Sequence, residues 1–153
     1  MIKKIISSIL ALCVVGSISV STYAYDTYVS EPICMYSDEG IMPLFDNVNY
    51  VTSGISINSN NKAVCTGAYM LYSKKKSVIT MTLMKSTDGV SNWTTVESWS
   101  QTNSVQNPTG MSRTSTNKLS SSYYYCTYVQ VQIYDSNDNV IETVSCFSNS
   151  CHL

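Results

Sequence analysis

The sequence alternates polar and apolar residues over much of its length, and a period of two is typical of β-strands. The clearest case is "SSYYYCTYVQVQIY" at residues 121–134. We expect one set of its side chains to face a hydrophobic core: Tyr123, Tyr125, Thr127, Val129, Val131 and Ile133. The opposite set should be at least partly in contact with water: Tyr124, Cys126, Tyr128, Gln130, Gln132 and Tyr134.

The same pattern recurs along the chain between residues that favour turns. Two strands are expected within 47–72, with "NSNN" between them, and two more within 76–100, with a turn at Asp88-Gly89. A last hairpin joins 121–134 to "NVIETVSCF", and the polar segment 100–122 leaves room for a short edge strand. No segment places apolar residues at helical spacing over three turns. The sequence therefore predicts an all-β fold: a small antiparallel β-sandwich, immunoglobulin-like or jelly-roll-like, of about six or seven strands.

Residues 1–24 have the pattern of a signal peptide. The basic start "MIKK" precedes an uncharged apolar run from Ile5 to Val20, and small residues at Thr22 and Ala24 indicate cleavage after Ala24. A membrane anchor needs about 20 apolar residues, and four serines interrupt this run. We therefore expect a secreted, extracellular protein without a membrane span after signal cleavage.

Two parts follow the signal peptide. Residues 25–45 lack periodicity and predict an irregular N-terminal arm, and residues 46–153 form the predicted β-sandwich domain. The chain has nine Lys and Arg against ten Asp and Glu, and Lys3 and Lys4 belong to the signal peptide. The mature protein would be acidic, so a nucleic acid is not an expected partner.

Five of the six cysteines remain once the signal peptide is removed: Cys34, Cys65, Cys126, Cys146 and Cys151. Export places them in an oxidising compartment, where disulfides form. We expect Cys65 to pair with Cys126 and Cys146 to pair with Cys151, which leaves Cys34 as the odd thiol. No two of the five form a C-x-x-C motif, so the spacing predicts no metal site.

The surroundings of Cys126 partly match the immunoglobulin pattern. Tyr124 stands two positions before Cys126, as in the tyrosine corner of immunoglobulin domains. Two features differ from that pattern: no tryptophan follows shortly after Cys65, and Gln130 and Gln132 share the face of Cys126. A bridge to Cys126 would then lie on a surface rather than through the core.

Aromatic side chains are the expected ligand contacts, because rings offer a large apolar surface with a polar edge. The candidates are Trp93, Trp99, Tyr124, Tyr128 and Tyr134. "STDGVSNW" at 86–93 nearly matches the Asp-box of sialidase-like propellers, but Gly89 comes one position early and Asn92 replaces a threonine. A structural hairpin explains this motif, and cross-strand packing explains the tyrosines, as alternatives to ligand binding.

The sequence does not favour catalysis or a cofactor. Its single histidine, His152, is next to last in the chain, so no Ser-His-Asp set can be assembled without a terminal residue. "DSNDN" at 135–139 begins like a calcium loop, but Val140 and Cys146 stand where that loop needs glycine and glutamate. We expect no catalytic residue, no metal and no cofactor.

Three stretches carry a resemblance: "GIMPLFDNVNYV", "TMTLMKSTDGVSNWTTVESWS" and "YYYCTYVQVQIYDSNDNVIETVS". Together they resemble a group of small exported proteins of Gram-positive gut and soil bacteria, which have a signal peptide, an "MPL" arm and one domain of unknown function. The likeness runs from Gly40 to Ser145 and implies secretion and an all-β domain, with no activity attached. Cys126, Cys146 and Cys151 are departures from that pattern, which would make the disulfides particular to this chain.

The sequence as a whole favours a secreted, non-enzymatic β-sandwich that binds a glycan, the cell envelope or an extracellular protein. The alternative is a small bacteriocin-like effector that acts on competing bacteria. Such effectors are usually more basic or more amphipathic than this acidic chain, and the acidic charge therefore favours binding.

Overall fold

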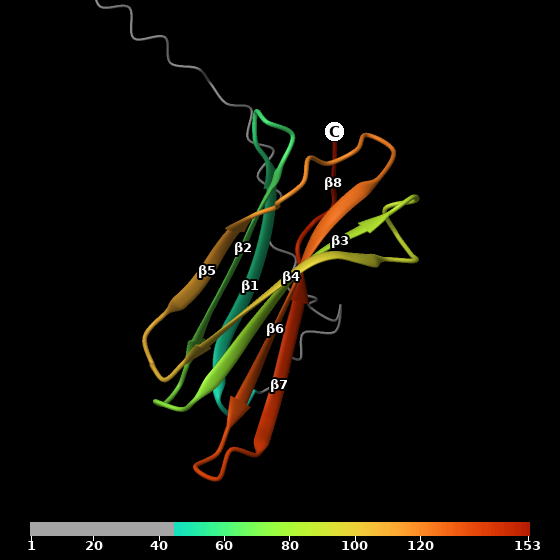
Figure 1. Cartoon of the computed structure of the whole chain (residues 1–153). Helices are drawn as coiled ribbons and strands as arrows, with labels where there is room; N and C mark the ends of the chain where they lie inside the picture. The colour runs from blue at the N-terminus through green and yellow to red at the C-terminus, as the bar shows by residue number, and fades with distance from the viewer. Residues whose placement is uncertain (1–44) are drawn as a thin grey trace, which may run out of the picture.

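The chain folds into two antiparallel β-sheets that face each other (Figure 1). The computed structural model describes residues 45–153, and these form strands and turns without a helix. Eight strands follow in chain order: β1 (Val48–Ile57), β2 (Ala63–Leu71), β3 (Ser77–Ser86), β4 (Thr94–Asn103), β5 (Thr109–Thr114), β6 (Tyr124–Tyr134), β7 (Val140–Phe147) and β8 (Cys151–His152). The predicted all-β sandwich is confirmed.

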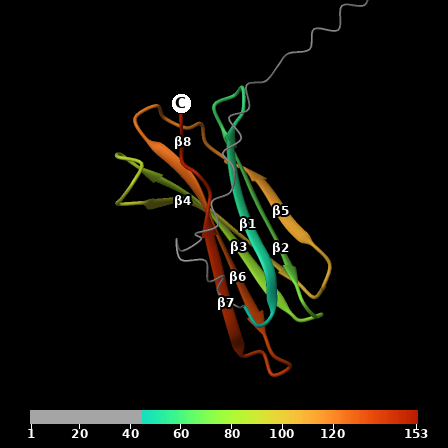
Figure 2. The ribbon, with the colours of Figure 1, turned by 180° about the vertical axis from the view of Figure 1, so that it is seen from behind.

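The order of the strands is that of an immunoglobulin-like sandwich. One sheet has the order β1-β2-β5, and the other has the order β4-β3-β6-β7, with β8 also paired to β6. Immunoglobulin domains likewise place the first, second and fifth strands in one layer and the third, sixth and seventh in the other. Figure 2 shows the two layers from behind. The short edge strand expected within 100–122 is β5, at the edge of the three-stranded sheet.

Asparagine and aspartate form the tight turns between paired strands. Asn61, between β1 and β2, and Asp138, between β6 and β7, have positive φ angles of 58° and 64°, which these residue types tolerate. The side chain of Asn58 accepts hydrogen bonds from the N–H groups of Asn60 and Lys62 at 3.0 and 3.1 Å. Local side-chain bonds therefore shape the first of these turns, at the expected position.

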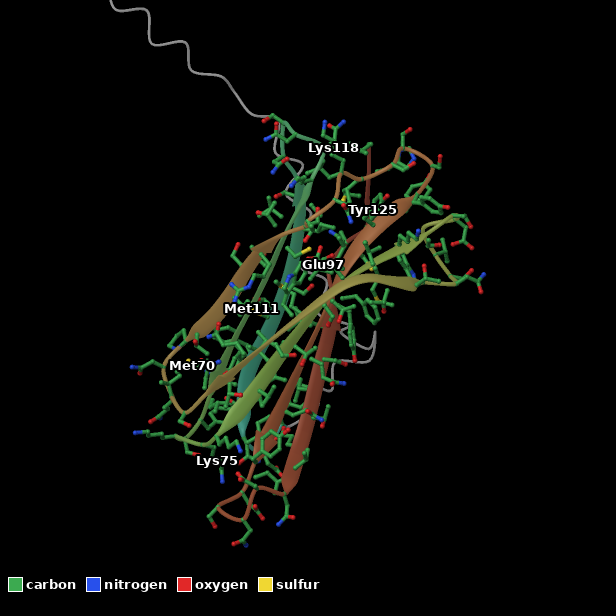
Figure 3. The ribbon with its side chains drawn as sticks, viewed as in Figure 1. Met70, Lys75, Glu97, Met111, Lys118 and Tyr125 are labelled. Atoms are coloured by element: carbon green, nitrogen blue, oxygen red, sulfur yellow. The ribbon has the colours of Figure 1, made fainter. Side chains whose placement is uncertain are left out.

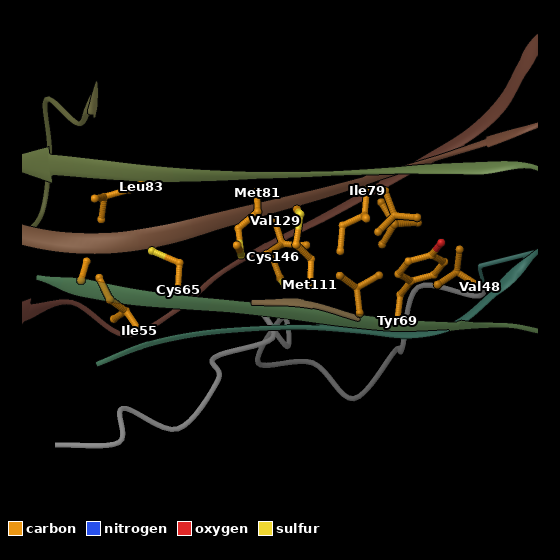
Figure 4. Packing of buried hydrophobic residues seen from close by; sticks show 14 of the residues in the cluster. Val48, Ile55, Cys65, Tyr69, Ile79, Met81, Leu83, Met111, Val129 and Cys146 are labelled. Atoms are coloured by element: carbon orange, nitrogen blue, oxygen red, sulfur yellow. The ribbon is translucent and has the colours of Figure 1, made fainter. Parts of the chain in front are cut away.

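The core lies between the inner faces of the two sheets (Figure 4). The five-stranded sheet contributes fully buried residues from β3 and β6: Ile79, Met81, Leu83, Val129, Val131 and Ile133. The three-stranded sheet contributes Val51, Ile55, Cys65, Tyr69, Leu71 and Met111. The inner face expected for 121–134 is confirmed from Tyr125 to Ile133, whereas Tyr123 precedes the strand and is half-buried.

The prediction that Cys126 contacts water is wrong. Cys126 is only 2% exposed. It still points away from the core, because its neighbours Tyr125 and Thr127 are both buried in it and alternate residues point to opposite faces. The rest of that face is partly exposed as expected: Tyr124, Tyr128, Gln130, Gln132 and Tyr134.

Tyr125, and not Tyr124, occupies the tyrosine corner. The hydroxyl of Tyr125 accepts a hydrogen bond from the N–H of Ser120 at 2.9 Å and lies 3.3 Å from the carbonyl oxygen of Ser120. In immunoglobulin domains the residue two positions after this tyrosine is the disulfide cysteine, and here that residue is Thr127. The pattern is therefore shifted by one residue, which places Cys126 on the outer face.

The two sheets approach closely where β2 meets β6. A Cβ atom on Gly67 would lie 2.8 Å from Cγ2 of Val129 and 3.5 Å from Cδ1 of Ile79. Atoms in a packed core do not approach so closely. Only glycine therefore fits this position without movement of its neighbours.

The predicted signal peptide, 1–24, and all of the predicted arm except its last residue lie outside the described residues. That last residue, Phe45, packs against the core. Within the described part of the chain, no helix has the length and apolar character needed to cross a membrane.

Candidate functional site

The outer face of the five-stranded sheet carries uncharged side chains in register. The pairing of β4, β3, β6 and β7 aligns them in three rows across the sheet. The rows are Ser98–Thr82–Tyr128–Phe147, Ser100–Thr80–Gln130–Ser145 and Thr102–Val78–Gln132–Thr143. Successive rows lie about 7 Å apart, because alternate residues of a strand share a face. We call these residues the outer platform.

Side chains of the outer platform hydrogen-bond to one another along and across the strands. The hydroxyl oxygens of Thr80 and Ser100 lie 3.0 Å apart, and the neighbouring Thr–Ser pair makes the same contact. The amide of Gln130 donates to the hydroxyl of Tyr128 at 3.3 Å. Hydroxyl and amide groups that make one such bond retain further donor or acceptor capacity. The outer platform can therefore bind a polar, uncharged ligand.

A hollow of about 450 Å³ lies at one end of the outer platform. Its lining consists of Gly89, Trp93, Cys126, Phe147, Ser148, Asn149 and Ser150. The rings of Phe147 and Tyr128 contact each other, with centroids 4.7 Å apart and planes at 40°. Since Phe147 lines the hollow and also belongs to the first row, the hollow and the outer platform form one continuous surface.

The loop between β3 and β4 places Trp93 at the hollow. The carboxylate of Asp88 accepts hydrogen bonds from the hydroxyl of Ser86 at 2.6 Å and from the N–H groups of Ser91 and Val90 at 2.8 and 2.9 Å. These bonds favour the charged form and hold the pKa of Asp88 well below its ordinary value. The indole N–H of Trp93 donates to the carbonyl of Val90 at 3.3 Å. The motif at 86–93 is therefore a structural turn, and the indole ring is the part left for a ligand.

Tyr124 connects this loop to the C-terminal strand. Its ring packs on Gly89, which has a φ angle of +71°, and a Cβ atom there would lie 2.8 Å from Cγ of Tyr124. On the other side, the rings of Tyr124 and His152 have centroids 4.7 Å apart. Tyr124 is 37% exposed, so part of its ring remains available beside the hollow.

The five aromatic residues predicted as ligand contacts do not lie together. Three gather around the hollow: Trp93, Tyr124 and Tyr128. Trp99 pairs with Met81, whose side chain is in the core, and it packs against the core from the inner side of β4. Tyr134 lies at the far end of β6, where the ammonium nitrogen of Lys76 is 5.2 Å from its ring centroid.

Sequence reasoning missed two aromatic residues of the site, Phe147 and His152. The alternation in "NVIETVSCF" places Phe147 on the same face as Thr143 and Ser145, and that alternation is the signal that identifies it. β8 is two residues long, so no local pattern indicates that His152 pairs with Tyr124.

No disulfide joins the cysteines in the described part of the chain: Cys65, Cys126, Cys146 and Cys151. The expected pairing of Cys65 with Cys126 does not fit their directions. Cys65 belongs to the core cluster, whereas Cys126 lines the hollow on the opposite face of β6. The side chain of Cys126 therefore lies on the outer side of the five-stranded sheet, whereas Cys65 lies on its inner side.

The expected pairing of Cys146 with Cys151 does not fit the register. Cys146 pairs with Val129, and Cys151 pairs with Tyr125. Those partners are four residues apart on β6, which corresponds to about 13 Å along a strand. A disulfide requires Cα atoms within about 7 Å. Cys34 lies outside the described residues.

A second hollow, of about 440 Å³, lies on the side of the sandwich next to β4. Glu97 and Lys118 contribute to its wall (Figure 3). The carboxylate of Glu97 accepts hydrogen bonds from the N–H and hydroxyl of Thr116 at 2.9 and 2.8 Å. The ammonium of Lys85 lies over the ring of Tyr123, 4.5 Å from its centroid. Because Glu97 and Lys85 already have partners, the hollow beside Trp93 is the stronger candidate.

The candidate site has the features of a binding surface. Within residues 45–153, no group of three or more His, Cys, Asp or Glu side chains is arranged to hold a metal ion. Comparisons with models of protein families, with curated proteins and with solved structures found no match. The geometry of the hollow and the outer platform is therefore the basis for a functional proposal.

Proposed function

We propose that this chain is an exported, non-enzymatic binding protein whose ligand is an uncharged glycan outside the cell. The observation that carries the proposal is the continuity between the hollow beside Trp93 and the uncharged outer platform. The export component rests on the signal-peptide pattern of residues 1–24.

The two parts of the surface suit the two kinds of surface on a sugar. The indole ring of Trp93 and the ring of Phe147 offer apolar contact to the C–H face of a pyranose. The hydroxyl and amide groups of the rows exchange hydrogen bonds with sugar hydroxyls. One sugar ring would occupy the hollow, and the next would lie over the first row, beside Tyr128.

The absence of charge on the outer platform supports an uncharged ligand. An anionic polymer is attracted by Lys or Arg side chains, and the twelve residues of the three rows include neither. The affinity must then come from ring contact and hydrogen bonds, both of which are nearly independent of salt.

The proposal does not include catalysis. The lining of the hollow contains Cys126 and serine hydroxyls as potential nucleophiles, but no carboxylate or histidine to activate them. Burial raises the pKa of the Cys126 thiol to about 12, so the thiol remains protonated and unreactive at neutral pH.

Glycan binding by the wild-type protein and two tryptophan variants tests the proposal. A glycan array would identify a ligand, and calorimetric titration would measure its Kd. We expect Trp93→Ala to weaken binding about tenfold or more, since a central aromatic contact is worth at least about 1.4 kcal/mol. Trp99→Phe is the matched control, because Trp99 packs on the inner side of the sheet, and it should bind as the wild type does.

Two results would count against this function. Equal affinities of the Trp93→Ala variant and the wild type would remove the hollow from the site. Failure to bind any glycan, together with inhibition of the growth of neighbouring bacteria, would favour the bacteriocin-like alternative.

A further inference from the structure

The far end of the outer platform repeats the arrangement at the end beside Trp93. At the end beside Trp93, Tyr128 of β6 pairs with Phe147 of β7. At the far end, Tyr134 of β6 pairs with Val140 of β7, and Val140 is 47% exposed. Residues directly opposite each other in an antiparallel pair share a face. The outer platform therefore has a tyrosine beside a large apolar side chain at both of its ends.

The two tyrosines are hydrogen-bonded to the polar residues that lie between them. The amide of Gln130 donates to the hydroxyl of Tyr128 at 3.3 Å, and the hydroxyl of Tyr134 donates to the side-chain oxygen of Gln132 at 3.2 Å. Each hydroxyl therefore points along β6 toward the middle of the outer platform. All four side chains are partly exposed. They form one continuous line, with a ring at each end and amide groups between the rings.

A third hollow, of about 550 Å³, adjoins Tyr134. The turn between β2 and β3 and the turn between β6 and β7 supply its lining: Lys74, Lys75, Lys76, Tyr134, Asp135, Ser136 and Asp138. Figure 3 shows Lys75 and Tyr125 near opposite ends of the five-stranded sheet. The outer platform thus lies between two hollows, each with an aromatic residue in its lining.

The charges of the third hollow largely balance one another. The ammonium of Lys76 contacts the carboxylate of Asp138 at 2.8 Å. Hydrogen bonds from Asn139 and the nearby charge of Lys75 lower the pKa of Asp135, which therefore stays charged beside Lys75. Two of the three lysines in the lining thus have a carboxylate close by. This end of the surface suits the same uncharged ligand as the three rows do.

The two ends are too far apart for one sugar unit to reach both. Cys126, in the hollow beside Trp93, and Tyr134 are eight residues apart on β6, which corresponds to about 26 Å along a strand. A disaccharide would fill the hollow and the first row and would not reach Tyr134. Only an extended chain of several units can contact both rings and the glutamines between them.

We propose that the outer platform binds a linear, extended oligosaccharide and that Tyr134 and Val140 form its second apolar subsite. The ring of Tyr134 and the exposed side chain of Val140 offer contact to the C–H face of a sugar unit. The amides of Gln130 and Gln132 exchange hydrogen bonds with the hydroxyls of the units between. This inference rests on the proposed function and adds the length and shape of the ligand to it.

Titration with oligomers of increasing length tests the second subsite. The probes are cello-oligosaccharides and chito-oligosaccharides, from the disaccharide to the hexasaccharide, and both series are linear and uncharged. The wild type should bind the hexasaccharide of the preferred series more tightly than its disaccharide. Tyr134→Ala should weaken binding of the hexasaccharide roughly fivefold or more and leave binding of the disaccharide unchanged. The unchanged disaccharide affinity also shows that the variant is folded.

Three further variants serve as controls. Trp93→Ala should weaken the binding of short and long oligomers alike. Tyr134→Phe keeps the ring and should retain most of the affinity for the hexasaccharide. Tyr72→Ala removes another exposed tyrosine, 55% exposed and outside the outer platform, and should change neither affinity.

The possible failures of the two proposals differ. Equal affinities for short and long oligomers, or an unchanged hexasaccharide affinity in Tyr134→Ala, would overturn the second subsite while binding that depends on Trp93 still supports the proposed function. Failure of every oligomer to bind, together with an empty glycan array, would overturn both.

Discussion

The two faces of the five-stranded sheet differ in nearly every property, although alternate residues of the same strands form them. On the inner face, the central residues of β3 and β6 have no exposed surface: Ile79, Met81, Leu83, Val129, Val131 and Ile133. On the outer face, threonine, serine, glutamine and tyrosine side chains remain partly exposed. Burial of the inner face holds the sandwich together. The outer face has no such role, and its hydroxyl and amide groups are therefore available to a ligand.

Two neighbouring residues of β6 depart from this division. Thr127 is a polar residue on the inner face, and Cys126 is a buried residue on the outer face. Both lie where β7 ends and β8 begins, and where the hydroxyl of Ser148 accepts a hydrogen bond from the N–H of Thr127 at 2.8 Å. The division between the faces is therefore least regular beside the candidate site.

The largest expected difference between the faces comes from truncating adjacent residues of β3. Leu83→Ala removes a fully buried side chain and leaves a cavity, so the free energy of unfolding should fall by about 2–5 kcal/mol. Thr82→Ala alters the outer platform and should cost about 1 kcal/mol or less. Urea unfolding followed by tryptophan fluorescence measures both. Equal losses would refute the distinction between the faces.

A smaller effect is expected where the inner faces meet. Gly67→Ala places a Cβ atom 2.8 Å from Cγ2 of Val129, and overpacking of this kind costs about 1–3 kcal/mol of unfolding free energy. Gly54→Ala is the control, because its new Cβ atom would meet the hydroxyl of Thr66, an exposed side chain that can rotate. Thermal unfolding in reductant compares the two variants. A larger loss for Gly54→Ala would contradict this account of sheet packing.

The smallest expected effect concerns Thr127, a polar residue on the inner face whose hydroxyl is buried. Thr127→Val removes a buried hydroxyl without a hydrogen-bond partner of good geometry, so the unfolding free energy should rise by about 1 kcal/mol. Thr80→Val on the outer face removes a hydroxyl that bonds to Ser100 and should bring no such gain. The comparison belongs in reductant, where disulfides do not contribute. A loss of stability in Thr127→Val would show that its contact with the thiol of Cys65 stabilises the fold.

The alternation identified the inner face of 121–134, but it failed to select the corner tyrosine. Three consecutive tyrosines, Tyr123 to Tyr125, precede Cys126. Tyr124 therefore stands two positions before the cysteine whichever of the three forms the corner, and the spacing does not discriminate between them. The hydrogen bonds to Ser120 select Tyr125. These bonds depend on the path of the chain between β5 and β6, which has no periodic signal. The shift by one residue also explains why the expected bridge from Cys65 to Cys126 does not fit.

The candidate site was only partly predictable for a similar reason. Trp93, Tyr124 and Tyr128 were recognised as aromatic residues, but their association with Phe147 depends on the pairing of β6 with β7. Trp99 was grouped with them because the sequence does not show which side of an edge strand faces the core. Its pairing with Met81 decides that question.

By itself the sequence determined that the chain forms strands, where the hairpin turns lie and which side chains of a strand share a face. Local backbone geometry controls these properties, since alternate residues of any strand point to opposite sides. Only the tertiary structure decided which distant residues come together: Trp93 and Phe147 line the same hollow, and the rings of Tyr124 and His152 contact each other. Such meetings depend on strand order and register, and contacts between segments far apart in the chain set both.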